Sequence, residues 1–257
     1  MKQYWYQKGD RNTPFFHTWA SHRKRINTIK EIFDDEDREW SEPEDIGTAF
    51  ELFYQKRFKM EGMVGIEECL EGLEVRVTLE MNEWLLRPFV AEEVDFAFSQ
   101  MHPLKSLGPN GFAACFYHKA WNIVRSEVYA AVLDFLNGSV FHGDINETYI
   151  ALISKIKNPT HITEFRLISL CNVIYKLIEK VLANRLKKVL GTNISPNQSA
   201  FIPGRLITDN IIIAFEALHT MNTRLKVAEG YMVLKLDMSK AYDRVEWNFL
   251  ETVMSRI

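Results

Sequence analysis

Near its end the chain carries a stretch, KLDMSKAYD (residues 235–243), whose side chains could do chemistry. Asp237 ends the run YMVLKLD, whose alternation predicts a strand over 231–237 with one wholly apolar face. That strand would hold Asp237 at the rim of a sheet. A carboxylate at such a rim can cap a helix, shape a turn or bind a hard cation such as Mg²⁺, and shaping a turn is the commonest role of an isolated Asp.

Other metal or disulfide chemistry is not indicated. Cys69, Cys115 and Cys171 lie far apart without a C-x-x-C pair, which argues against a zinc module and predicts no disulfide partner. The seven histidines lack the spacing of metal ligands. No apolar run is long enough to span a bilayer, and the first residues, MKQYWY, lack the apolar core of a secretory signal. We therefore expect neither a membrane partner nor secretion.

Charge is unevenly distributed along the chain, although the net charge is only −3. Residues 1–30 carry seven basic side chains against one acid, 31–100 carry six against twenty, and 101–257 carry eighteen against thirteen. A basic C-terminal half suits a nucleic-acid contact surface, and solvated helix faces would give the same count. Charge alone does not choose between the two.

The elements that would position these side chains are mostly helices. Apolar periodicity predicts a helix beginning near Pro43 and further helices at 91–101, 121–137, 172–190, 208–222 and 246–256. Besides 231–237, strands are expected at 148–156 and 164–170, on either side of a turn at Asn158-Pro159. Residues 31–45 should form a loop or hairpin, and 61–82 should be poorly ordered or poor in strands.

The predicted helix at 172–190 has the clearest pattern. Its apolar residues recur at steps of three and four, Asn172 is a candidate N-cap, and Lys176, Lys180 and Lys187 lie opposite the apolar side. Upstream of it, KSLGPNG (105–111) predicts a turn-rich loop in which glycines supply special backbone angles.

Three blocks in the C-terminal half, in this order, resemble the reverse transcriptases of LINE-type (non-LTR) retrotransposons, especially plant ones. They are EFRLISLCNVIYKLIEKVLANRL (164–186), ISPNQSAFIPGRLITDNIIIAFEALH (194–219) and KLDMSKAYDRVEW (235–247). The resemblance extends to KGDRNTPFFHTWASHRKRI near the N-terminus and to MHPLKSLGPNGFAACFYHKAW (101–121), and is weakest at 60–85. It implies an α+β fold with right-hand polymerase-like fingers and a partial palm, helix-rich with a small antiparallel sheet. Residues 1–85 would be an N-terminal extension, and 86–257 the fingers and the start of the palm.

The resemblance also implies a metal site. Asp237 matches the family's first metal-binding aspartate, and the backbone carbonyl of Met238 would be a further ligand of Mg²⁺, the family's cofactor. Tyr242 matches the aromatic gate that excludes a ribose 2′-hydroxyl. Asp243 is expected to start the next helix rather than to bind metal.

Two further groups follow from the same resemblance. Arg166 aligns with the fingers arginine that holds the incoming dNTP triphosphate, and Lys155, or alternatively Lys157, would supply a second phosphate contact. Gln198 and Arg205 fall in the block that lies along the template. The implied partners are an RNA template, a DNA primer and dNTPs.

The chain also departs from the family pattern. Leu167 and Ser154 replace family prolines, and Asn110 replaces an aspartate. No paired aspartate follows Asp237, and the adjacent pair Asp34-Asp35 lies in the wrong context. We therefore expect a chain truncated within the palm and inactive as a polymerase by itself.

Other interpretations remain open from the sequence. The chain could be a non-catalytic nucleic-acid-binding module, or a non-functional relic that tends to aggregate. An unrelated metal hydrolase could use Asp237, although no His or Glu constellation completes such a site. The location is expected to be nuclear or cytoplasmic, with the nuclear alternative resting only on the family, because the basic cluster HRKR (22–25) suits a solvated or nucleic-acid-facing patch.

Overall fold

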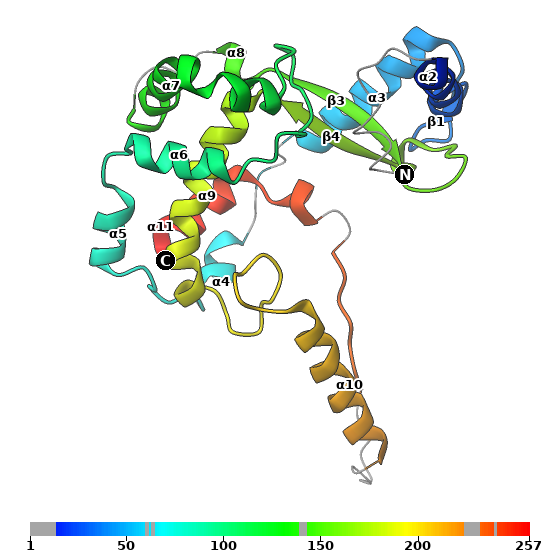
Figure 1. The fold of residues 1–257 in the computed structure, drawn as a ribbon. Coiled ribbons are helices and arrows are strands. Elements are labelled where there is room, and N and C mark those ends of the chain that lie inside the picture. Colours follow the sequence, from blue (N-terminus) through cyan, green and yellow to red (C-terminus); the bar gives the residue numbers. More distant parts are fainter. Residues whose placement is uncertain (1–13, 60–61, 63–64, 139–142, 224–231, 239–240) are drawn as a thin grey trace. The chain divides into compact units, whose positions relative to one another are not determined.

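Residues 14–59, 62, 65–138, 143–223, 232–238 and 241–257 are described by a computed structural model of the chain. Contacts divide the chain into two units, one made of residues 1–59 and 152–168 and the other of residues 60–151 and 169–257 (Figure 1). These units have other bounds than the ranges 1–85 and 86–257 expected for the domains, which stay a prediction. Each unit is built around a core of its own.

Helices dominate both units, and the two sheets among the described residues are two-stranded, which is compatible with the α+β prediction. The polymerase-like fingers and palm stay a prediction. The first unit contains α2 (Pro14–Asn27), β1 (Ile32–Phe33), β2 (Glu39–Trp40) and α3 (Pro43–Phe58). The hairpin strands β3 (Thr148–Ser154) and β4 (Phe165–Cys171) place their tip, with the 3-10 helix η1 (Ile162–Glu164), in the first unit and their base in the second. The second unit contains α4 (Ile66–Leu70), α5 (Leu79–Leu85), α6 (Ala91–Ser99), α7 (Ala114–Leu136), α8 (Gly143–Asn146), α9 (Val173–Asn193), α10 (Ile207–Thr223), the 3-10 helix η2 (Ala241–Arg244) and α11 (Trp247–Arg256).

The first unit closes when the hairpin tip packs on α3. The helix begins at Pro43, as predicted, and its buried face supplies Phe50 to a core that also contains Ile162 and Phe165. The rings of Phe50 and Phe165 meet edge-on with centroids 5.4 Å apart. The backbone N–H of Phe33 in β1 donates to the Thr160 carbonyl at 2.8 Å. Segments far apart in the sequence thus complete one core.

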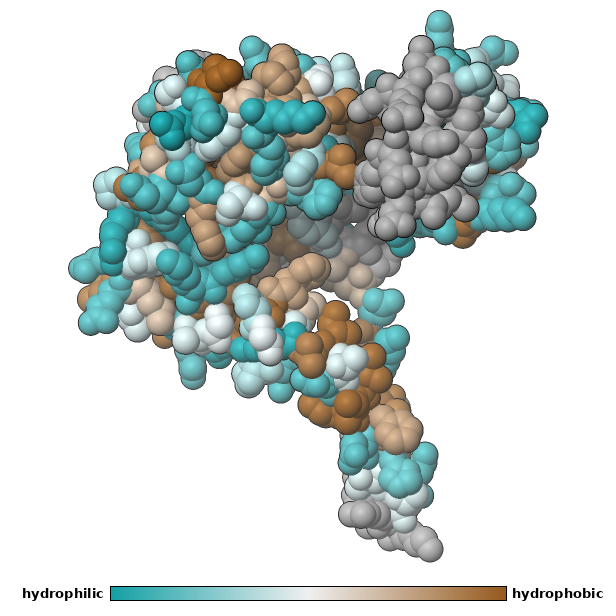
Figure 2. All heavy atoms as spheres, viewed as in Figure 1, coloured by the Kyte–Doolittle hydropathy of each residue, from teal (hydrophilic) through white to brown (hydrophobic). Residues whose placement is uncertain are grey.

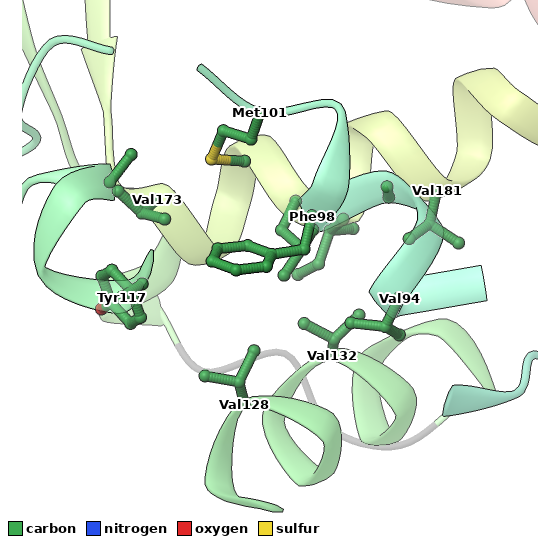
Figure 3. Packing of buried hydrophobic residues seen from close by; sticks show 12 residues of the cluster. Val94, Phe98, Met101, Tyr117, Val128, Val132, Val173 and Val181 are labelled. Carbon is green, nitrogen blue, oxygen red and sulfur yellow. The ribbon is translucent and has the colours of Figure 1, made fainter. Parts of the chain in front are cut away.

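The second unit is organised by α9, which packs against both α6 and α7. The buried side chains come from these three helices and from Met101, near the start of the loop between α6 and α7, and Figure 3 shows them converging. They include Val94, Phe98, Val128, Val132, Val173 and Val181. The predicted amphipathic helix at 172–190 is therefore confirmed, and it extends to Asn193.

A buried arginine joins α9 to the segment that leads into α6. Arg185 lies on the apolar side of α9 and is only 5% exposed. Its guanidinium forms a bidentate pair with Glu93, with Nε donating to Oε1 at 2.8 Å and Nη2 to Oε2 at 2.7 Å. It also donates to the carbonyls of Leu85, Arg87 and Pro88. All five N–H donors of the side chain are thereby used, which is what burial of a guanidinium requires.

The loop between α6 and α7 is held against the N-terminus of α9. A Cβ added at Gly108 would lie 2.4 Å from the backbone nitrogen and Oδ1 of Asn172, so only glycine fits there. Asn172 occupies the predicted N-cap position without capping α9. Its Oδ1 instead accepts the N–H of Asn110, and its Nδ2 donates to the carbonyl of Asp144. The predicted turn at 105–111 is confirmed, with Gly111 at a φ of 73°.

The expected strand at 231–237 was wrong. Residues 232–238 are irregular, and the apolar face expected to enter a core is exposed, with Met232 at 85% and Leu236 at 84% (residue 231 lies outside the described part). A strand needs a neighbour to pair with its backbone, and no described residue supplies one here.

The expected start of one helix also needs correction. The helix expected at 121–137 begins seven residues earlier, at Ala114, because its first turns are anchored to α6. There the His118 ring stacks on Phe98 and its Nε2 lies 2.8 Å from the Met101 carbonyl oxygen. The segment 61–82 was expected to be poorly ordered or poor in strands, and its described residues form no strand. They contain α4 and the start of α5, the latter capped by the Thr78 hydroxyl, which accepts the N–H of Met81.

Candidate nucleotide and template site

The tip of the β3–β4 hairpin carries the side chains expected to contact the triphosphate. Arg166 is exposed on β4, and among the described residues its guanidinium has no hydrogen bond or ion pair. Lys155 follows β3, and its ammonium donates to the Thr163 carbonyl at 2.5 Å, so part of its donor capacity is used within the hairpin. Lys157 is exposed. Arg166 is thus the guanidinium most available to an anionic ligand at this tip.

Hydrogen bonds inside the tip fix the backbone that presents Arg166. Asn158 adopts a φ of 57°, which confirms the predicted turn at Asn158-Pro159. The Glu164 carboxylate accepts the N–H groups of His161 and Thr160 at 3.1 and 2.7 Å, and these bonds hold the pKa of Glu164 below its ordinary value. The Glu164 carbonyl accepts the N–H of Lys155 at 2.7 Å. Hydrogen bonds within the tip therefore stabilise its backbone conformation.

Arg205 organises the loop between α9 and α10. Its Nη1 donates to the carbonyls of Ser195 and Gln198 at 2.5 and 2.7 Å. Its Nη2 donates to the carbonyls of Gly191 and Ile194 at 3.2 and 3.5 Å. The guanidinium expected on a template phosphate is thus engaged with its own loop, and its contact with template stays a prediction.

The same loop presents two other side chains to solvent. Gln198 is exposed, with its Nε2 donating to the Ala200 carbonyl at 3.3 Å. Phe201 is 97% exposed and has a φ of 65°, a left-handed conformation that side-chain-bearing residues seldom adopt. The four bonds from Arg205 to carbonyls of residues 191–198 stabilise this loop.

The residues expected to bind metal and to gate the sugar lie in the second unit. Asp237 is exposed, Met238 is 58% exposed and Tyr242, in η2, is 92% exposed. Tyr242 is within electrostatic reach of Tyr175 on α9, whose pKa is raised by burial, by Glu179, by Cys171 and by Tyr242 in that order. The structure therefore leaves Asp237 and Tyr242 accessible to a ligand.

The residues present do not form a complete site for Mg²⁺. In the described part of the chain no three His, Cys, Asp or Glu side chains gather as a metal site. One exposed carboxylate and one backbone carbonyl supply two of the roughly six ligands that Mg²⁺ requires, and waters alone would make such a site weak. No chemical step can therefore be derived through a metal held by this chain alone.

The structure distributes the predicted residues over the two units. Lys155 and Arg166 belong to the first unit, while Asp237 and Tyr242 belong to the second, together with the loop that carries Arg205. Sequence reasoning missed the contacts of Asn172 and the burial of Arg185. The burial had a readable signal, since residue 185 falls between Val181 and Val189 on the apolar stripe of α9.

Comparisons with known proteins bear on these residues directly. Residues 156–257 match the family model for reverse transcriptase (RNA-dependent DNA polymerase). This reverse transcriptase segment includes all of the predicted site residues except Lys155. The resemblance inferred from the sequence is confirmed at this level, and its plant-like and truncated aspects stay predictions.

A transposon protein is similar to nearly the whole chain. The chain is 28% identical over 244 residues to an uncharacterized 149 kDa protein of the transposon TX1 from Xenopus laevis. The match covers 94% of the chain and 18% of that protein, so the chain spans under a fifth of its relative's length.

In the described part of the chain no helix has the length and apolar character needed to cross a membrane. The three cysteines are free thiols.

Proposed function

We propose that this chain forms the fingers and the first palm block of a non-LTR retrotransposon reverse transcriptase. The observation that carries the proposal is the match of residues 156–257 to the reverse transcriptase family, with Arg166, Asp237 and Tyr242 all exposed within that segment. The similarity of the whole chain to a transposon protein supports a mobile-element origin.

Each side chain has a chemical role in this proposal. The guanidinium of Arg166 binds the triphosphate of an incoming dNTP, because its fork of donors matches phosphate oxygens. Lys155, whose ammonium donates to Thr163, adds a second cation beside it. The ring of Tyr242 closes against the sugar and disfavours a 2′-hydroxyl. In a complete polymerase with further ligands, Asp237 and the Met238 carbonyl would help to hold Mg²⁺, which would supply positive charge near the phosphates.

Gln198 and Arg205, in the loop between α9 and α10, have different roles in template binding in this proposal. Gln198 faces solvent and contacts the template strand, while Arg205 holds the loop through four carbonyl bonds. A guanidinium so engaged still has its Nε–H for a phosphate. Arg205 therefore acts first on the position of Gln198.

The 257 residues do not polymerise by themselves in this proposal. Asp237 is not followed by a paired aspartate, so two dications beside a triphosphate would be insufficiently neutralised. A primer-extension assay with purified protein, an RNA template, a DNA primer and Mg²⁺ or Mn²⁺ should give no product. Templated extension would contradict the proposed lack of activity.

The proposed function itself is tested by binding rather than by turnover. The protein should bind a primed RNA template, followed by fluorescence anisotropy, with an affinity that falls as salt is raised. Addition of the next complementary dNTP should tighten that complex for the parent chain and not for Arg166→Ala. Loss of all nucleic-acid binding at low salt would contradict the assignment.

A second candidate function is a nucleic-acid-binding module without catalysis. The lack of a metal-ligand cluster among the described residues favours it. Template binding without any effect of the complementary dNTP would select this alternative.

A further inference from the structure

Four lysines gather along one side of the second unit. Lys176, Lys180 and Lys187 are four and seven residues apart on α9, so at 100° per residue they lie within about 40° of each other around the helix. Lys105 comes from the loop between α6 and α7. Together, Lys105, Lys176, Lys180 and Lys187 are called the lysine stripe below.

The loop is fixed beside α9 by a contact of the stripe itself. The ammonium of Lys176 donates to the carbonyl of Ser106 at 2.7 Å and lies 3.3 Å from its hydroxyl oxygen. Lys105, the neighbour of Ser106, is thereby brought next to the first turns of α9.

The charges of the stripe act on each other. The pKa of Lys180 is lowered by burial first, and then by Lys187 and Lys105. The pKa of Lys176 is lowered mainly by burial, with Lys105 adding to the decrease and Cys171 and Glu179 opposing it. These directions show that Lys180 is repelled by Lys187 and Lys105, and Lys176 by Lys105, so neighbouring members of the stripe repel one another.

Within the described residues, no acid forms an ion pair with a lysine of the stripe. The ion pairs found in the described part of the chain involve other residues, and none of the four amines lies within ion-pair distance of a described carboxylate. The charge of Glu179 raises the pKa of Lys176, and burial raises the pKa of Glu179. Unpaired like charges in one place are unfavourable, and an anionic ligand removes that cost.

The length of the stripe indicates the size of the ligand. From Lys176 to Lys187 the helix rises by eleven steps of 1.5 Å, or about 16 Å. Phosphates along one strand of a duplex rise by about 3.4 Å each, so the stripe spans about five of them. A single nucleotide would be too short to contact both ends.

We propose that the lysine stripe is a phosphate-binding surface that holds the backbone of a nucleic-acid strand along α9. Three of its lysines lie within the segment that matches the reverse transcriptase family, and the choice of nucleic acid over another polyanion rests on the function proposed above. The stripe is separate from the hairpin tip that carries Arg166 and from the loop that carries Arg205.

Salt dependence of binding tests this proposal. Each lost phosphate contact should lower the magnitude of the slope of log K against log salt by about 0.7 for a single strand and about 0.9 for a duplex. The double variant Lys180→Gln, Lys187→Gln should therefore lower it by about 1.4 to 1.8. Glutamine keeps most of the aliphatic stem of lysine and removes only the charge.

The neighbouring residue provides a matched control. Lys188 is also exposed on α9, but its ammonium lies 4.7 Å from the centre of the Trp84 ring, on another side of the helix. Lys188→Gln changes the net charge as Lys187→Gln does and should leave the slope unchanged. Circular dichroism and thermal melting establish that the variants fold.

The outcomes separate the stripe from the proposed function. If the parent chain binds and the double variant keeps its slope, the stripe is wrong and the function stands. An equal loss in Lys188→Gln would show a general charge effect and would also overturn the stripe. Stripe-dependent binding to phosphatidylserine vesicles as strong as to RNA would overturn the nucleic-acid assignment. If the parent chain binds no nucleic acid at all, the proposed function fails with it.

Discussion

At the scale of single residues, Arg185 carries the largest concentration of polar contacts in the second unit. Arg185→Met should destabilise the protein by about 3–5 kcal/mol, because it leaves the Glu93 carboxylate and three carbonyls without their donor. Urea unfolding followed by circular dichroism measures the change. Arg125→Met, at an exposed position of α7, should change stability by less than about 0.5 kcal/mol. A loss below about 1 kcal/mol for Arg185→Met would show that the pair contributes little.

Its partner gives a prediction about pH. The pKa of Glu93 lies below its ordinary value of 4.5, mainly because Arg185 hydrogen-bonds to the carboxylate. The folded state therefore binds the proton less readily than the unfolded state, so the stabilisation is complete above that value and is lost as the pH falls through the folded pKa. The stability difference between the parent chain and Glu93→Gln should shrink in acid below pH 4.5. A difference that stays constant down to pH 3 would contradict the assignment of the shift to this pair.

Residue types predicted which side chains could bind a ligand better than they predicted the contacts of those side chains in the fold. The sequence showed that Asp237 and Arg166 were candidates and could not show that Arg205 would be bound to four carbonyls, because such contacts depend on the path of a loop. Asn110 illustrates the opposite case. It replaces a family aspartate, yet its Oδ1 still accepts the N–H of Phe112 at 3.1 Å, a turn contact that a carboxylate also makes.

At the scale of elements, the contact between the loop at 105–111 and α9 depends on one missing side chain. Gly108→Ala should destabilise the second unit by about 1–3 kcal/mol, since its Cβ would collide with the backbone of Asn172. Gly191 lies on α9 itself and has open space around it. Gly191→Ala should therefore stabilise the protein by about 0.5–1 kcal/mol. Chemical denaturation of both variants measures the difference in sign. Equal effects would mean that the loop shifts freely away from α9.

Elements with strong amphipathic patterns were predictable, but whether an apolar face would be covered by a neighbour was not. The helices α3 and α9 appeared from periodicity because their apolar stripes meet real cores. The helix α10 was also predicted, yet none of its residues is buried, and apolar side chains gather on the surface of this segment in Figure 2. The exposed residues include Ile211, Ile212, Ile213 and Phe215. The alternating pattern of residues 231–237 likewise predicts an apolar face. Whether another element covers that face depends on distant parts of the chain and cannot be predicted from these seven residues.

At the scale of the whole molecule, two separate cores predict two separate responses to mutation. Phe50→Ala should cost the first unit about 3–5 kcal/mol, because it empties the contact between α3 and Phe165. Hydrogen exchange should then accelerate in α3 and around residues 160–165, and should not change in α6, α7 and α9. Phe58→Ala, on the same helix but 57% exposed, serves as the control. Faster exchange in α9 for Phe50→Ala would show that the cores are coupled.

The α+β class and the similarity to reverse transcriptases were predictable because blocks of sequence agree in order. The division into units was not, since it depends on a hairpin whose tip and base take part in different cores. Periodicity locates a strand along the chain and carries no information about which distant helix it will cover.

That hairpin imposes an order on synthesis. The helix α3 leaves the ribosome about 100 residues before Ile162 and Phe165, which at ordinary elongation rates is a delay of about 5–20 s. During that interval the apolar side of α3 has the cover supplied by β1 and β2 but lacks the part supplied by Ile162 and Phe165, so nascent chains should engage chaperones at this point. For the same reason a recombinant fragment that ends at residue 85 would lack Ile162 and Phe165, two of the seven buried residues of this core.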